Sequence, residues 1–147
     1  MAQIERIEER HLASVAEIER LCFSSPWSEE SLALLTREGA VGIAAMCDGR
    51  VAAYGGMLCV LDEGQITNVA THPDHRRQGL AGEVVNALIS YARERGIAFI
   101  TLEVRESNAG AIALYEGLGF YRVGIRKNFY KKPCEAAILM QMDIGKD

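Results

Sequence analysis

The stretch HPDHRRQGLAGEV, residues 72–84, places two neighbouring arginines and two glycines where a strand is expected to turn into a helix. The first turn of a helix carries unpaired backbone N–H groups and a partial positive charge, which together suit a phosphate or pyrophosphate. Gly79 and Gly82 would let such an anion approach the backbone closely, and Arg76 and Arg77 would add positive charge. An ordinary basic turn before a helix explains the same residues, so the pattern by itself leaves both interpretations open.

Other phosphate-binding and metal-binding patterns fit this sequence less well. It contains no GxxxxGK motif followed by Ser or Thr, and Gly117-Leu118-Gly119 follows an expected helix, whereas a dinucleotide-binding fingerprint follows a strand. A nucleotide triphosphatase is therefore disfavoured. His72 and His75 could be read as a metal-binding pair, but a metal site needs further ligands, and an exposed loop explains these two side chains better. We expect no metal.

Two further residues could move protons. Glu103 interrupts the otherwise apolar run FITL at the end of an expected strand, where a carboxylate could accept a proton. The same glutamate could instead pair with Arg105 or face solvent. Tyr115, with an ordinary pKa of about 10, could donate a proton. It also shares a helical face with Ile112, so it could equally be a packing residue.

Composition narrows the class of protein. The chain has 147 residues, 49% of them hydrophobic, which is enough for one domain with a full core. Its formal net charge of -4 argues against a general nucleic-acid binder, because such proteins usually carry an excess of Lys and Arg. The four cysteines include no Cys-x-x-Cys pair, which favours free thiols in a reducing cytosol. The longest weakly polar run, Val51–Leu61, is about half a membrane span, so we expect neither a targeting nor a transmembrane segment.

Strands and helices alternate along the chain, without an internal repeat or linker, in the order βααβββαβαββ. Strands are expected at Gln3–Ile7, Val41–Cys47, Val51–Leu61, Gly64–Thr71, Ala98–Val104, Phe120–Arg126 and Ala136–Met142. Helices are expected at Leu12–Cys22, from Ser28 onward, from Leu80 to about Arg95, and from the capping residue Asn108 to Leu118, and the first two of them are expected to be amphipathic. Asp48-Gly49 is typical of a type I′ turn and predicts a hairpin between the second and third strands.

The segment Gly64–Arg105 has the length of a right-handed βαβ unit, whose two strands are parallel. In open α/β sheets, ligands bind at the carboxyl ends of such strands. Here these ends are Val69–Thr71 and Glu103–Val104, and the helix start near Gly79 faces the same edge. We therefore expect the two strand ends and the helix start to converge on one site.

The segment Arg76–Ala81, RRQGLA, matches the R/Q-x-x-G-x-G/A signature, and the chain resembles the GNAT superfamily of N-acetyltransferases. The likeness covers nearly the whole chain and narrows to the RimI-type ribosomal protein alanine N-acetyltransferases. It rests on FSSPWSEESL near the start, NVATHPDHRRQGLA in the middle, and LEVRESNAGAIALYEGLGF followed by RKNFY. The resemblance implies an α/β (α+β) protein with the GNAT acyltransferase fold: a mixed central sheet, a splayed parallel strand pair and flanking helices, as a single domain over residues 1–147.

The resemblance also implies roles for individual residues. Acetyl-CoA would be the acetyl donor, Glu103 the proton acceptor that activates the amine, often through water, and Tyr115 the acid beside the sulfur of CoA. Asn108 would contact the pantetheine arm in addition to capping a helix. The residues implied in binding acetyl-CoA, several of them through main-chain amides, are Val69, Ala70, Thr71, Arg76, Arg77, Gln78, Gly79, Leu80, Ala81, Gly82 and Asn108.

By the same resemblance, the acceptor is the N-terminal alanine of a small-subunit ribosomal protein, bound as an extended peptide. Its groove would be built from the first two helices and the hairpin near Phe129-Tyr130, with Ser25-Pro26-Trp27 as a further wall. The segment Cys134-Glu135-Ala136-Ala137 departs from common relatives, in which an acidic pair often precedes the alanine, and this difference bears on peptide preference.

Two other functions stay open at this point. One is a GNAT enzyme that acetylates a small-molecule amine, and the other is a CoA-binding regulatory module without turnover. The presence of both Glu103 and Tyr115 favours turnover. We expect a cytoplasmic protein that binds neither nucleic acid nor a membrane.

Overall fold

The computed structural model describes residues 2–131 and 133–145, so both ends of the expected domain, at residues 1 and 147, lie outside the described residues. Its strands are β1 (Gln3–Arg6), β2 (Ala40–Cys47), β3 (Arg50–Val60), β4 (Glu63–Thr71), β5 (Phe99–Arg105), β6 (Tyr121–Lys131) and β7 (Cys134–Asp143). Its α-helices are α1 (Leu12–Cys22), α2 (Glu29–Leu32), α3 (Leu80–Glu94) and α4 (Ala109–Leu118). Short 3-10 helices are η1 (Glu9–His11), η2 (Ala33–Thr36) and η3 (Pro73–His75). The expected order βααβββαβαββ is confirmed.

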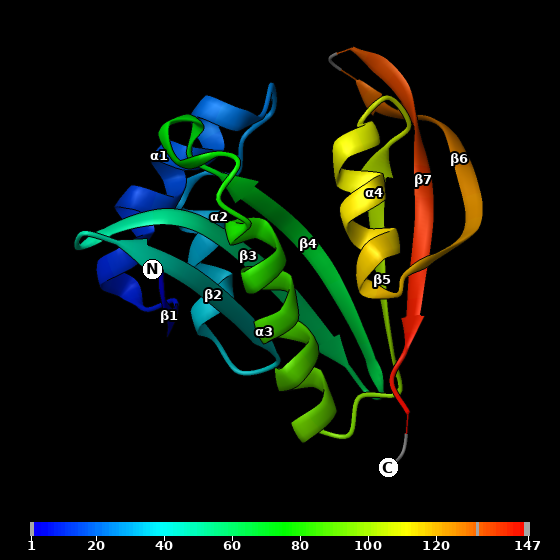
Figure 1. Ribbon diagram of the computed structural model, residues 1–147, viewed down its shortest axis with the longest axis horizontal. Coiled ribbons are helices and arrows are strands. Elements are labelled where there is room, and N and C mark those ends of the chain that lie inside the picture. Colours follow the sequence, from blue (N-terminus) through cyan, green and yellow to red (C-terminus); the bar gives the residue numbers. More distant parts are fainter. Residues whose placement is uncertain (1, 132, 146–147) are drawn as a thin grey trace.

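The strands form one seven-stranded mixed sheet in the order β1-β2-β3-β4-β5-β7-β6 (Figure 1). The pairing of β4 with β5 is parallel, and every other neighbouring pair is antiparallel. At the β2–β3 hairpin, Asp48 and Gly49 have φ angles of 52° and 78°, the left-handed conformation that a type I′ turn requires. The hairpin expected from this dipeptide is confirmed.

The parallel strands β4 and β5 separate soon after they meet. Their pairing covers only Glu63–Gln65 with Phe99–Thr101, and beyond it the two strands diverge into a wedge (Figure 1). A β-bulge at Thr67 accompanies the divergence, because Asn68 pairs with Gly56 and Ile66 pairs with Met57, which leaves Thr67 unpaired between them. The edge of β4 that faces the wedge therefore has no strand partner beyond Gln65 in the described structure.

Helices cover both faces of the sheet. The helices α3 and α4 pack on one face, where Val84, Leu88 and Ile112 belong to the larger apolar cluster. On the other face, α1, α2 and η2 bury a second cluster that includes Val15 and Leu32. Such one-sided burial is what the apolar periodicity predicts for amphipathic helices. Each face of the sheet thus has its own packed layer of helices.

The C-terminal hairpin is longer than its sequence pattern indicated. The strands β6 and β7 extend beyond Phe120–Arg126 and Ala136–Met142, and the pairing of Tyr130 with Glu135 carries the ladder to the hairpin end. The rings of Phe129 and Tyr130 pack edge to face, with centroids 5.0 Å apart. The extension brings these aromatic residues above the wedge. No helix in the described part of the chain is long and apolar enough to cross a membrane.

Candidate active site

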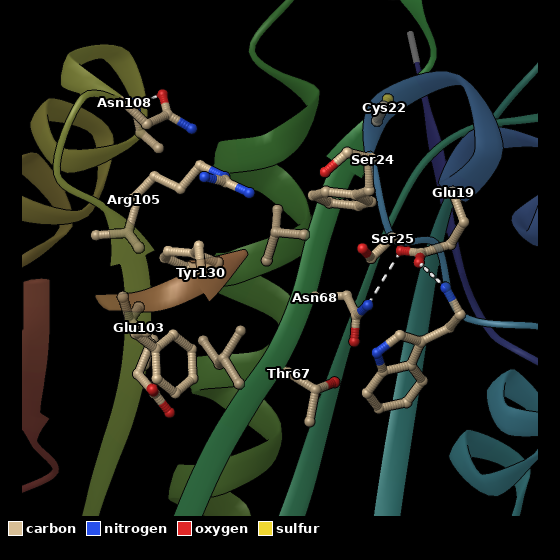
Figure 2. Close-up of a pocket in the computed structure, with 18 of the residues that line it drawn as sticks. Glu19, Cys22, Ser24, Ser25, Thr67, Asn68, Glu103, Arg105, Asn108 and Tyr130 are labelled. Atoms are coloured by element: carbon tan, nitrogen blue, oxygen red, sulfur yellow. Dashed lines mark hydrogen bonds between the residues drawn. The ribbon is translucent and has the colours of Figure 1, made fainter. Parts of the chain in front are cut away.

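A cleft of about 640 Å³ lies in the wedge between β4 and β5 (Figure 2). Residues of β4, β5 and α4, the end of α1 with the loop that follows it, and the hairpin end of β6 form its walls. The cleft follows directly from the divergence of the parallel strands, because their unpaired edges and the side chains above them are left facing each other. Four of the residues expected at the site line it: Val69, Glu103, Asn108 and Tyr115.

Glu103 projects from β5 into this cleft. Its side chain is 23% exposed, its Oε2 atom lies 3.6 Å from the guanidinium of Arg126, and no hydrogen-bond donor of the described residues reaches that oxygen. Arg105 forms an ion pair with Glu135 at 3.2 Å and lies over the ring of Tyr130. A partly buried carboxylate oxygen without a donor is available to accept a proton from a ligand.

Tyr115 of α4 lines the cleft and is almost fully buried. Burial raises the pKa of its hydroxyl to about 12, so the group stays protonated at neutral pH. Its ring packs edge to face on Phe120 at 5.6 Å. Both interpretations of this tyrosine therefore coexist: the ring is a packing residue, and the protonated hydroxyl belongs to a residue that lines the cleft.

Asn108 caps α4, since its Oδ1 atom accepts a hydrogen bond of 3.1 Å from the backbone N–H of Ala111. The expected capping role is confirmed. Its position on the cleft wall places the start of α4 beside the same space as Glu103.

The segment Arg76–Gly82 lies outside the cleft, at the start of α3 (Figure 1). Gly79 is the N-cap residue, with φ of 73°, and it has no side chain that could accept the first amide hydrogens of the helix. A Cβ atom added to Gly79 would meet nothing within 4 Å, and Arg77 also adopts a left-handed φ of 66°. This exposed, uncapped helix start with Arg76 and Arg77 beside it suits a pyrophosphate.

The end of β4 links this helix start to the cleft. Ala70 and Thr71 are the last two residues of β4, and Ala70 is buried whereas Thr71 is half-buried. The carbonyl of Thr71 accepts a hydrogen bond from Cys22, whose Sγ atom is also 3.7 Å from Arg76. The expected site residues thus fall into two groups along one edge, a cleft and an anion cradle, joined by the last residues of β4.

The rings of His72 and His75 pack edge to face, with centroids 5.9 Å apart. Both side chains are half-buried rather than exposed. Within the described ranges, no group of three or more His, Cys, Asp or Glu residues could hold a metal ion.

The sequence pattern missed a buried polar cluster behind the cleft. Glu19 has no exposed surface, and its carboxylate accepts hydrogen bonds from the backbone N–H of Trp27 at 2.7 Å, from Asn68 Nδ2 at 3.0 Å and from the hydroxyl of Tyr54. Burial and the Glu19 carboxylate raise the pKa of Tyr54, which keeps that hydroxyl a donor. One signal was present: Glu19 lies four residues after Val15, on the face of α1 that is otherwise apolar.

Comparison with known proteins decides the family. The profile of the Acetyltransferase (GNAT) family matches residues 12–120. This chain belongs to the GNAT acetyltransferase family. Acetyltransferases of the GNAT family use acetyl-CoA.

Several members of the GNAT family are similar over the whole chain. The ribosomal protein bS18-alanine N-acetyltransferase of Escherichia coli strain K12 is 39% identical over 147 residues, covering 99% of each chain. The corresponding enzyme of Haemophilus ducreyi is 35% identical over 144 residues, covering 95% of this chain and 98% of the relative. The crystal structure of the ribosomal-protein-S18-alanine N-acetyltransferase from Escherichia coli has a TM-score of 0.92 at 38% identity, and covers 100% of this chain and 96% of that chain. The expected GNAT fold is confirmed.

Proposed function

We propose that this GNAT enzyme transfers the acetyl group of acetyl-CoA to the N-terminal α-amine of an alanine-starting ribosomal protein, with bS18 as its substrate. The full-length similarity to bS18-alanine N-acetyltransferases supports the substrate class. The observation that carries the chemistry is the Oε2 atom of Glu103, which is buried in the cleft without a hydrogen-bond donor.

The reaction needs a proton acceptor, because a free α-amine has a pKa of about 8 and is largely protonated at neutral pH. Acetyl-CoA supplies an acyl group activated as a thioester. The ammonium form first releases one proton to solvent, and the neutral amine attacks the acetyl carbon. Glu103 takes the second proton from the amine, directly or through water, as the N–C bond forms. Tyr115 gives its proton to the sulfur as the C–S bond breaks. Proton transfer from Glu103 to Tyr115 through solvent then restores both side chains.

The acetyl donor is proposed to lie along the unpaired edge of β4. The main-chain N–H groups of Val69 and Thr71 face the wedge, because those of His72 and, two residues earlier, Ala70 point toward β3. They bind the acetyl carbonyl and the pantetheine arm and act as oxyanion donors when charge develops, and Ala70 lies between them. The start of α3 holds the pyrophosphate through the amides of Gly79, Leu80, Ala81 and Gly82, with Arg76, Arg77 and Gln78 around it. Asn108 contacts the pantetheine arm from the opposite wall.

The acceptor peptide is proposed to enter from the other end of the cleft. Phe129 and Tyr130 of β6 lie on one side of it, and Ser25 and Trp27 of the α1–α2 loop lie on the other. Burial and the neighbouring Glu103 carboxylate raise the pKa of Tyr130, so its hydroxyl stays protonated and can donate a hydrogen bond to the peptide.

The cellular setting follows from the substrate. Cys22, Cys47, Cys59 and Cys134 are all free thiols, which persist in a reducing cytosol. We place the enzyme in the cytoplasm, with the ribosomal protein as its partner and without direct contacts to nucleic acid or a membrane.

Thiol release from acetyl-CoA in the presence of an alanine-starting bS18 peptide tests this function. We expect turnover by the unaltered protein and a fall of about 10²- to 10⁴-fold in the Glu103→Gln variant, the range for loss of a general base, with acetyl-CoA binding unchanged. Glu63→Gln is the matched control, because Glu63 lies at the closed end of the wedge, where Thr101 donates a hydrogen bond of 3.1 Å to it. Turnover with small amines but not with the peptide would contradict the substrate, and full activity of Glu103→Gln would remove this residue from the mechanism.

A further inference from the structure

Three buried side-chain polar atoms of the described residues have no hydrogen-bond partner: Thr67 Oγ1, Asn68 Oδ1 and Glu103 Oε2. All three belong to residues that line the same cleft. A buried polar atom without a partner costs desolvation free energy, so such atoms are rare unless a ligand satisfies them. The proposed base accounts for Glu103, but the two atoms on β4 have no role in that chemistry.

The amide of Asn68 has only one orientation that fits its surroundings. Asn68 is 9% exposed, and its nitrogen donates a hydrogen bond of 3.0 Å to Glu19, whose carboxylate can only accept. Glu19 is fixed in turn by Tyr54 and by the backbone N–H of Trp27. Figure 2 shows the amide nitrogen of Asn68 directed at Glu19 and the amide oxygen turned away from it. The buried carboxylate therefore leaves an accepting oxygen in the cleft.

The separation of the parallel strands explains why this oxygen can face a ligand. Both strands line the cleft with unbroken runs of residues, because their separated edges form its walls: residues 66–69 of β4 and residues 102–105 of β5. Asn68 and Glu103 lie on opposite walls of the cleft (Figure 2). A group bound between them would meet two hydrogen-bond acceptors.

We propose that Asn68 binds the acceptor amine, through a hydrogen bond from the amine to its Oδ1 atom, and that Glu19 is a positioning residue that holds the Asn68 amide in this orientation. This inference rests on the proposed function. A neutral amine has two N–H bonds, of which Glu103 takes one proton, and the other N–H needs an acceptor during the attack. Hydrogen bonding to the Glu19 carboxylate polarises the amide, which makes Oδ1 a stronger acceptor.

The first test removes the Asn68 oxygen and the N–H group of the acceptor amine separately. Asn68→Ala is assayed with an alanine-starting peptide and with the same peptide carrying N-methylalanine at its start, whose amine has one N–H fewer. We expect kcat/KM for the alanine peptide to fall about 10- to 100-fold, the range for an unmade buried hydrogen bond, and kcat/KM for the N-methylated peptide to change by less than about threefold. The KM for acetyl-CoA should stay the same.

Each other outcome overturns the inference in a recognisable way. Equal losses with both peptides would mean that Asn68 does not contact the amine, and a raised KM for acetyl-CoA would assign its oxygen to the pantetheine arm. Unchanged activity of Asn68→Ala alongside normal turnover by the unaltered protein would sink this inference alone. Absence of turnover by the unaltered protein would overturn the proposed function, and this inference with it.

The second test inverts the amide. The backbone N–H of Trp27 can only donate, so in Glu19→Gln the amide oxygen of the new glutamine accepts this hydrogen bond. The NH₂ group of the glutamine then faces Asn68. The Asn68 amide must rotate to offer its oxygen to that NH₂ group, which leaves its own NH₂ group in the cleft. We expect kcat/KM for the alanine peptide to fall about as far as in Asn68→Ala. The double variant Glu19→Gln/Asn68→Asp restores an accepting oxygen in the cleft and keeps one buried carboxylate, so it should recover activity at least about fivefold over Glu19→Gln.

Tyr54→Phe is the matched control for this exchange. It removes one hydrogen bond from Glu19 without changing which atom of Asn68 faces the cleft, so its kcat/KM should stay within about threefold of the unaltered value. A loss in Tyr54→Phe as large as in Glu19→Gln, or no recovery in a folded double variant, would show that Glu19 acts only through the packing of the core. Thermal melts identify any variant that does not fold. If a Glu19 variant does not fold, the comparison of the two peptides in Asn68→Ala tests whether Asn68 binds the amine.

Discussion

Tyr115 is the residue whose chemistry depends most on its surroundings. Burial raises the pKa of its hydroxyl from 10.0 to about 12, so deprotonation in the folded state begins well above neutral pH. The folded form therefore holds this proton more tightly than the unfolded chain does. The stability that this adds is complete below pH 10 and is lost as the pH rises toward 12. Over the ordinary working range, the hydroxyl remains a proton donor.

This protonation predicts how Tyr115→Phe behaves with pH. We expect the variant to lower kcat by about 10²-fold, as for loss of a general acid, and the ratio of the two kcat values to stay constant between about pH 6 and 10. The measurement is a pH profile of thiol release at saturating acetyl-CoA and peptide. A ratio that narrows above about pH 8 would mean that the hydroxyl titrates too early to have this environment, and a fall in thermal stability with unchanged kcat would assign Tyr115 to packing alone.

Individual site residues differ in how well their roles can be predicted from the sequence. Glu103 stands out because it interrupts an apolar strand at its carboxyl end, and the structure places it in the cleft as expected. Asn68 has no such signal, since an asparagine in a strand says nothing of which amide atom will face a ligand. That orientation depends on Glu19, which is 49 residues away along the chain. Only the packing of α1 against β4 brings the two residues together.

At the scale of elements, the start of α3 is the feature proposed to bind the pyrophosphate. Gly79→Glu places a negative side chain at the positive end of this helix, and we expect it to weaken CoA binding about tenfold or more. Isothermal titration with CoA measures the change.

Gly96→Glu provides the matched control at the other end of the same helix. Gly96 has φ of 71° against 73° for Gly79, and an added Cβ meets nothing within 4 Å at either position. The two variants therefore share the backbone strain and the added charge, and they differ in their distance from the proposed cradle. Equal affinities of the two variants for CoA would contradict pyrophosphate binding at the start of α3.

The elements that carry the site were predictable to different degrees. Apolar periodicity and capping residues predict α3, α4 and both parallel strands to within a few residues, because these signals are local. The bulge at Thr67 and the early separation of β4 from β5 have no local signal in the residues themselves. They arise where strands from distant parts of the chain meet, and it was the family resemblance that indicated a splayed pair.

At the scale of the whole molecule, the wedge raises the question of whether its two sides fold together. They join through the short pairing of Glu63–Gln65 with Phe99–Thr101. The larger apolar cluster also connects them, because it contains Ile43 of β2 and Val84 of α3 together with Met140 of β7. Packing across the sheet thus compensates for the few strand hydrogen bonds at the base of the cleft.

We therefore propose that residues 1–147 form a single domain that unfolds in one cooperative transition. Trp27 is the only tryptophan and lies in the α1–α2 layer, bonded through its backbone to Glu19, so its fluorescence reports the side of the wedge that holds the acceptor loop. Far-UV circular dichroism reports all helices and strands. In a urea titration the two signals should give the same midpoint and the same slope. A fluorescence transition that is complete at lower urea than the dichroism transition would mean that the α1–α2 layer separates first, and that the acceptor side of the cleft is less stable than the rest of the sheet.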